Sequence, residues 1–136
     1  MSSDWEPEFL TREIIDAIHE EQINAFGGLS GIRDESALES AIAAAANVYH
    51  YGGADLYEIA AAYAFHLAQA QAYFDGNKRT GVQAALVFLE ARGIDTEDLS
   101  AEETHAMMIK IASREANRND LAAYLRFQLP GKEKTP

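Results

Sequence analysis

Cysteine is absent from this chain of 136 residues. Without thiols the protein can form neither disulfide bonds nor thiolate metal sites. The length suits one domain, and a domain of this size can bury a sufficient core without cross-links. We therefore expect a single globular domain that is compatible with a reducing compartment.

Positive charge is also scarce. Eleven Lys and Arg residues stand against 22 Asp and Glu residues, which gives a formal net charge of -11. Such an acidic chain repels nucleic-acid phosphates, so binding to bulk nucleic acid through a basic face is not expected. The acidic balance favours solubility.

Long apolar runs are missing too. No run reaches the roughly 20 residues that a membrane span needs. The start of the chain, Met1–Glu6, has neither the basic residues nor the apolar stretch of a signal peptide. These features predict a cytoplasmic protein that does not bind membranes.

Apolar residues recur at helical spacing through most of the chain. The expected helices cover residues 11–26, about 35–45, 57–72, about 77–92, about 101–111 and 118–127. Residues 47–55, with two glycines and two tyrosines, are predicted to form a loop. No segment shows the alternating pattern of a normal strand. The chain is therefore predicted to be all-α.

Two of these helices, 57–72 and 77–92, are apolar nearly all round. This pattern is typical of helices buried at the centre of a domain. We predict a compact single-domain helical bundle in which these two helices are joined by the loop around Asp75. The domain should cover residues 10–128, between an N-terminal segment, 1–9, and a flexible tail, 129–136.

The junction between the two buried helices is unusually rich in charge. It reads Asp-Gly-Asn-Lys-Arg-Thr-Gly over residues 75–81. A helix start offers free backbone N–H groups and a positive dipole end, and Gly76 lets the backbone approach a ligand closely. Lys78 adds charge, and Arg79 adds a guanidinium fork that matches phosphate oxygens. Gly76, Asn77, Lys78 and Arg79 are therefore the predicted phosphate-binding residues.

Asp75 is the nearby anion and is a candidate ligand for Mg²⁺ that bridges phosphates. A plainer interpretation also exists, in which Asp75-Gly76 is an ordinary interhelical turn and the two cations are solvated. The local chemistry by itself does not separate these two interpretations.

A longer sequence pattern favours the phosphate-binding interpretation over the ordinary turn. Residues 71–81 read Gln-Ala-Tyr-Phe-Asp-Gly-Asn-Lys-Arg-Thr-Gly. This run closely resembles His-Pro-Phe-x-Asp-Gly-Asn-Lys-Arg-Thr, the signature of the death-on-curing (Doc) toxins in the Fic/Doc superfamily. Residues 26–34, 38–41 and 84–93 look like that family as well, so the resemblance covers roughly residues 10–127.

The resemblance implies a helical bundle of the Fic/Doc type and a nucleotide-dependent transferase. Asp75 matches the acid associated with the metal, residues 76–78 match the anion-binding loop, and Arg79 matches the arginine that grips nucleotide phosphate. Mg²⁺ and ATP, or another nucleoside triphosphate, are the implied cofactor and co-substrate. The Doc branch phosphorylates a translation elongation factor and is neutralised by a small antitoxin whose helix covers the active-site groove.

The AMP-transferring branch of the superfamily carries Gly where Lys78 stands and Arg where Val82 stands. Neither residue is present here, which disfavours AMP transfer. The self-inhibitory motif of other Fic proteins is also missing from the sequence. Any inhibition would therefore come from a partner.

This sequence departs from the family signature at the catalytic histidine, which in the family takes the proton from the target hydroxyl. Gln71 stands at that position. A glutamine amide is not basic near neutral pH, and losing a general base costs about 10²–10⁴-fold in rate. Gln71 can still orient a hydroxyl by hydrogen bonds, because phosphoryl transfer depends mostly on positioning and charge neutralisation. The alternative is a catalytically impaired member that uses the loop as a binding module.

The chain's four histidines offer no obvious replacement. His66 lies five residues before Gln71 on the same helix, about 140° around its axis, and is expected to point elsewhere. We expect His19, His50 and His105 to be structural or exposed, since no pair has metal-ligand spacing. Packing is likewise the favoured role of Met107, Met108 and the tyrosines, although four tyrosines (Tyr49, Tyr51, Tyr57 and Tyr63) could instead line a groove.

Overall fold

The computed structural model describes residues 7–130. The described helices are α1 (Arg12–Phe26), α2 (Glu35–Gly52), α3 (Leu56–Ala70), α4 (Asn77–Ala91), α5 (Ala101–Ala112) and α6 (Arg118–Gln128). Within this range there is no strand, and a single antiparallel bridge joins Ile32 to Tyr73. The predicted all-α class is confirmed. The segment Met1–Glu6 and residues 131–136 of the predicted tail lie outside the described residues.

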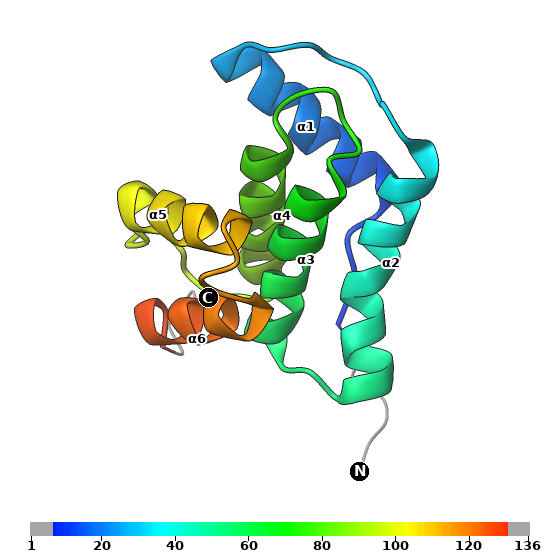
Figure 1. The fold of residues 1–136 in the computed structure, drawn as a ribbon. Helices are drawn as coiled ribbons and strands as arrows, with labels where there is room; N and C mark the ends of the chain where they lie inside the picture. The colour runs from blue at the N-terminus through cyan, green and yellow to red at the C-terminus, as the bar shows by residue number, and fades with distance from the viewer. Residues whose placement is uncertain (1–6, 131–136) are drawn as a thin grey trace.

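Helices α3 and α4 occupy the centre of the bundle, as their apolar sequences predict (Figure 1). Helix α3 packs against α2, α4 and α6, and α4 also packs against α1. Every residue from Ile59 to Ala64 is buried. A Cβ added to Gly81 of α4 would lie 2.7 Å from the carbonyl oxygen of Ala64. The small residues therefore let the two central helices approach closely.

Side-chain caps start most of the helices at the predicted places. Thr11, Asp34, Asp55, Ser100 and Asn117 each accept a hydrogen bond from the backbone N–H three residues later. Such caps satisfy N–H groups that have no partner within the helix. Helix α4 differs, because it begins after Gly76 and has no side-chain cap. The backbone N–H groups in the first turn of α4 therefore have no side-chain cap as hydrogen-bond acceptor.

The predicted loop over residues 47–55 is wrong for most of its length, because α2 continues to Gly52. Val48 and Tyr49 pack against the core, and this burial extends the helix past the polar Asn47. Gly53 then closes the helix in the left-handed conformation, with φ 64°, and donates its N–H to the Tyr49 carbonyl. The tertiary contacts of two side chains thus outweigh local loop propensity.

The third helix also ends earlier than predicted, at Ala70 instead of Ala72. Gln71 adopts φ 48°, ψ 44°, a left-handed conformation in which helix propagation stops. The carbonyl of Ala72 accepts hydrogen bonds from the N–H groups of Arg33 and Asp34. Pairing with a distant segment therefore competes with the last turn of α3.

Candidate functional site

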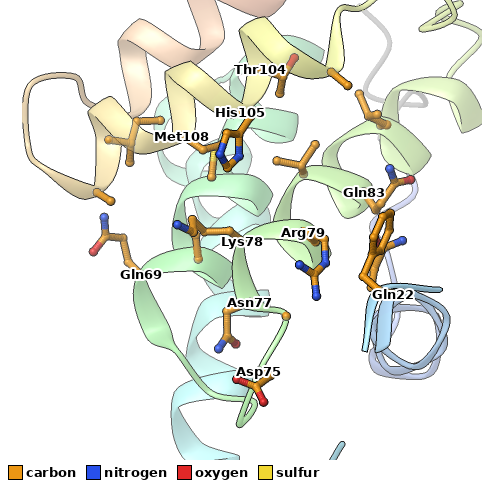
Figure 2. A pocket seen from close by; sticks show the side chains of 18 of the residues that line it. Gln22, Gln69, Asp75, Asn77, Lys78, Arg79, Gln83, Thr104, His105 and Met108 are labelled. Atoms are coloured by element: carbon orange, nitrogen blue, oxygen red, sulfur yellow. The ribbon is translucent and has the colours of Figure 1, made fainter. Parts of the chain in front are cut away.

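A groove of about 710 Å³ lies at the junction of α3 and α4. Its walls come from the 71–79 segment, α4, the end of α1 and the inner face of α5 (Figure 2). The six predicted site residues all line it: Gln71, Asp75, Gly76, Asn77, Lys78 and Arg79. The volume is in the range of small-molecule sites, so the fold brings the predicted residues together around a space that can hold a ligand.

Positive groups are concentrated where α4 begins. Lys78 and Arg79 are exposed on its first turn, and neither forms an ion pair with another described residue. Arg79 Nη2 is 3.5 Å from the Gly27 carbonyl oxygen, and the guanidinium carbon lies 4.9 Å from the centre of the Phe26 ring. A strongly acidic protein thus keeps two unpaired cations beside an uncapped helix start. This arrangement attracts an anion.

Asp75 lies in the loop before α4 and lines the same groove as these cations (Figure 2). Its Oδ2 accepts a hydrogen bond of 2.7 Å from the N–H of Leu29. This bond fixes the carboxylate while it stays exposed at the groove. Residues 7–130 contain no cluster of three or more His, Cys, Asp or Glu side chains arranged for a metal. A single exposed carboxylate such as that of Asp75 can be one ligand of a cation that is also held by ligand phosphates, as Mg²⁺ commonly is.

Asn77 has a structural role in the loop in addition to lining the groove. Its Nδ2 donates to the Tyr73 carbonyl at 2.9 Å, and its Oδ1 accepts from the Tyr73 N–H at 3.0 Å. Both ends of the amide are thereby bound to one backbone residue. The side chain of Asn77 closes the turn, which leaves its main-chain N–H for an anion.

The segment 27–34 is aligned along the motif loop. The N–H of Phe74 donates to the Gly31 carbonyl at 3.2 Å, and Ile32 pairs with Tyr73. Gly28 has φ 116°, and a Cβ there would lie 3.0 Å from the Cβ of Asp75. Glycine is thus required where this segment crosses the loop. The side chains of Leu29, Ile32 and Phe74 are exposed, and that of Phe74 lines the groove.

Gln71 is exposed at the C-terminal end of α3. A residue with a Cβ in the left-handed region is strained, and the surrounding structure must maintain it. Here the Gln71 carbonyl accepts two hydrogen bonds from Arg33, from Nε at 3.1 Å and Nη2 at 2.6 Å. The backbone of Gln71 is thereby constrained at the edge of the groove.

The structure places two histidines at or beneath the groove that the sequence did not mark as functional residues. His105 was expected to be structural or exposed; it is exposed and also lines the groove from α5, opposite Lys78 (Figure 2). His19 is buried beneath the loop, with Nε2 2.8 Å from the Asp75 carbonyl oxygen. No local sequence signal marks either one, because each depends on how separate helices pack.

The other aromatic and histidine predictions concern packing. His66 does not line the groove that holds Gln71, and its Nε2 lies 3.0 Å from Arg118 Nη1. Met108 is buried and forms part of the groove wall. None of the four tyrosines lines this groove, but Tyr51 lines a second pocket near His66 and Arg118. Among the described helices, none is both long and apolar enough to cross a membrane.

The fold and the site together define a helical protein whose two central helices are joined by a loop that places two cations and an uncapped helix start at one groove. A family model described as "Fic/DOC family" matches residues 9–89. The chain is 30% identical over 118 residues to "Protein kinase doc" of Escherichia phage P1, covering 86% of this chain and 92% of the relative. It is 36% identical over 107 residues to "Toxin Doc" of Mycolicibacterium smegmatis, covering 74% and 80%. The chain belongs to the Fic/Doc family.

Proposed function

We propose that this protein is a Doc-like toxin that binds a nucleoside triphosphate with Mg²⁺ and phosphorylates a hydroxyl group of a target protein. The observation that carries the proposal is the placement of Lys78, Arg79 and the uncapped start of α4 around one groove. The names of two relatives, a protein kinase and a toxin, support the same activity. The class of target suggested by the family is a translation elongation factor.

Each residue has a defined task in this proposal. The main-chain N–H groups after Gly76, the Lys78 ammonium and the Arg79 guanidinium bind and neutralise phosphate oxygens. Asp75 is the residue that would hold Mg²⁺, which supplies further charge neutralisation on the phosphates when bound. The target hydroxyl oxygen bonds to the γ-phosphorus while the bond from that phosphorus to the β-bridging oxygen breaks. The nucleoside diphosphate then leaves.

Position 71 offers no general base to accept the proton of the target hydroxyl, because it holds a glutamine. Gln71 can orient the hydroxyl, and the proton passes to the phosphoryl oxygens or to solvent as the new bond forms. A rate below that of a histidine-containing relative is therefore expected.

The activity can be tested with γ-labelled ATP, Mg²⁺ and a cell lysate. We expect one or a few labelled proteins with the native chain and loss of most labelling with Arg79→Ala. Arg114→Ala removes a cation outside the groove and is the matched control. ATP labelled at the α-phosphate separates phosphoryl transfer from AMP transfer, the weaker alternative. Absence of labelling, or equal labelling by the Arg79→Ala variant, contradicts the proposal.

A second candidate is a binding module that keeps the anion site without turnover. The non-basic side chain of Gln71 favours it. Gln71→His separates the two, since histidine tolerates the left-handed conformation better than most residues. An inert native chain together with an active variant would favour the module, whereas activity in both favours the toxin.

As a Doc-like toxin, the protein is expected to have a small antitoxin partner. We propose that a helix of this partner covers the groove, where the wall formed by Val82, Leu86 and Met108 is apolar. Co-purification with the product of a neighbouring gene, and protection of Arg79 from modification in that complex, would test the assignment.

A further inference from the structure

His19 is a buried titratable residue that the proposed chemistry does not use. It belongs to α1, has a relative exposure of 4%, and lies beneath the motif loop. Its Nε2 is 2.8 Å from the carbonyl oxygen of Asp75, a residue 56 positions away. A carbonyl oxygen can only accept, so the hydrogen bond requires that Nε2 carry the proton. The contact thereby excludes the neutral tautomer that carries its proton only at Nδ1.

The plane of the His19 ring is set by Tyr73. The two rings stack with their centroids 3.7 Å apart and 7° between their planes. The Tyr73 hydroxyl donates to Asp16 Oδ1 at 2.6 Å, and Asp16 also pairs with Arg12. Burial and the adjacent carboxylate of Asp16 raise the pKa of Tyr73 above its usual range, so the hydroxyl keeps its proton. Helix α1 thus anchors both rings of the stack.

The hydrogen bond from His19 determines which way one peptide group faces. The described peptides include no cis bond, and in a trans peptide the carbonyl oxygen and the following N–H point in opposite directions. Because the Asp75 carbonyl is turned toward His19, the N–H of Gly76 is turned away from it. Gly76 itself lines the groove.

The reversed peptide would be harmful to anion binding. The peptide bond itself is rigid, but its plane can flip through ψ of Asp75 and φ of Gly76. Glycine adopts positive and negative φ with similar ease, so this flip is easier here than between two larger residues. Reversal would withdraw the Gly76 N–H and turn the partial negative charge of a carbonyl toward the phosphate position. A neighbouring donor that holds the carbonyl prevents this.

We propose that His19 is a positioning residue that keeps the Asp75–Gly76 peptide oriented with its amide, and not its carbonyl, toward the bound polyanion. This inference rests on the proposed function, because it assumes that the groove binds phosphates. His19 touches no ligand in this proposal and acts through the loop.

The test compares two variants that differ in one property. His19→Phe keeps an aromatic ring to stack on Tyr73 and removes the N–H donor, whereas His19→Gln restores an N–H. His50→Phe is the matched control, because His50 contacts Phe9 and Tyr49 far from the loop in sequence. The measurements are the Kd of inorganic triphosphate and of ATP by calorimetry, and the amide shift of Gly76 during the titration.

We expect His19→Phe to weaken triphosphate binding by about 10- to 100-fold. This is the effect of losing one hydrogen bond to a charged group, here the bond from the Gly76 N–H to a phosphate oxygen. The shift of the Gly76 amide on adding triphosphate should be largely lost. His19→Gln should recover most of the affinity, and His50→Phe should bind like the native chain. The unfolding temperature of each variant shows whether its loss of affinity reflects misfolding.

The outcomes separate the two proposals. If the native chain binds neither triphosphate nor ATP, both the proposed function and the role of His19 are rejected. If the native chain binds and His19→Phe binds equally well, the nucleotide site stands and the role of His19 is rejected. Nitrogen NMR of the native protein provides a check without any variant, because a His19 ring protonated at Nδ1 and bare at Nε2 would rule out the hydrogen bond.

Discussion

The guanidinium of Arg33 donates two hydrogen bonds to the carbonyl oxygen of Gln71, at 3.1 Å from Nε and 2.6 Å from Nη2. The two residues lie 38 positions apart, on opposite sides of the bridge between Ile32 and Tyr73. This contact ties the segment before α2 to the left-handed end of α3. Gln71 is therefore constrained through its backbone while the residue remains at the groove.

Removing this contact should loosen the edge of the groove. Arg33→Ala deletes both hydrogen bonds to Gln71 and is expected to lower the free energy of unfolding by about 1 kcal/mol, since the site is exposed. Chemical denaturation measures the loss, and hydrogen exchange should show faster exchange of the Phe74 amide. Arg114→Ala is a control, with no expected effect on that amide. Unchanged exchange in Arg33→Ala would mean that Arg33 does not hold the two segments together.

Close packing of the central helices can be tested at Gly81. The Cβ of Gly81→Ala would lie 2.7 Å from the Ala64 carbonyl oxygen, so the two backbones must separate. We expect a loss of about 1–3 kcal/mol in the free energy of unfolding, the usual cost of overpacking a core. Urea denaturation measures it.

Gly52→Ala is the matched control for this substitution, because a Cβ at Gly52, also in a helix, meets nothing within 4 Å. Its stability should be unchanged or raised by up to about 1 kcal/mol, because alanine favours the helix. Equal effects of the two substitutions would show that contact between α3 and α4 is not the cause.

Stability should fall at alkaline pH because of a buried tyrosine. Burial raises the pKa of Tyr63 from 10.0 to about 12, and its hydroxyl oxygen accepts a hydrogen bond of 2.8 Å from the Leu10 N–H. Between these two pKa values the unfolded chain loses the proton while the folded chain keeps it. The stabilisation is thus complete below pH 10 and is lost as the pH rises toward 12. Tyr63→Phe should flatten this decline, measured by urea denaturation at a series of pH values.

Histidine 66 should titrate below its ordinary value of 6.5, because burial and then the charge of Arg118 lower its pKa. The neutral ring is favoured in the folded state, so its stabilisation is present above pH 6.5 and is lost as the pH falls through the lower pKa. Arg118→Gln removes the charge and should raise the pKa of His66, as followed by NMR of the ring protons. A His66 pKa equally low in that variant would assign the whole shift to burial.

Much of the secondary structure follows from local sequence. Helix starts at Thr11, Asp34, Asp55, Ser100 and Asn117 are visible because a cap acts over three residues. The predicted end of α2 was wrong, because the last turn of this helix depends on the core residues that Val48 and Tyr49 contact. Such contacts lie beyond any local window.

The sequence by itself determined the helical class, the buried character of α3 and α4, and the loop chemistry of residues 75–79, because these depend on neighbours within a few positions. Tertiary structure decided the rest: the bond from His19 to Asp75, the clamp of Arg33 on Gln71, and the place of His105 in the groove wall. These relationships join residues tens of positions apart, and the relative placement of whole helices selects them. Helical periodicity shows which face of a helix is apolar, but it does not say which partner that face will meet.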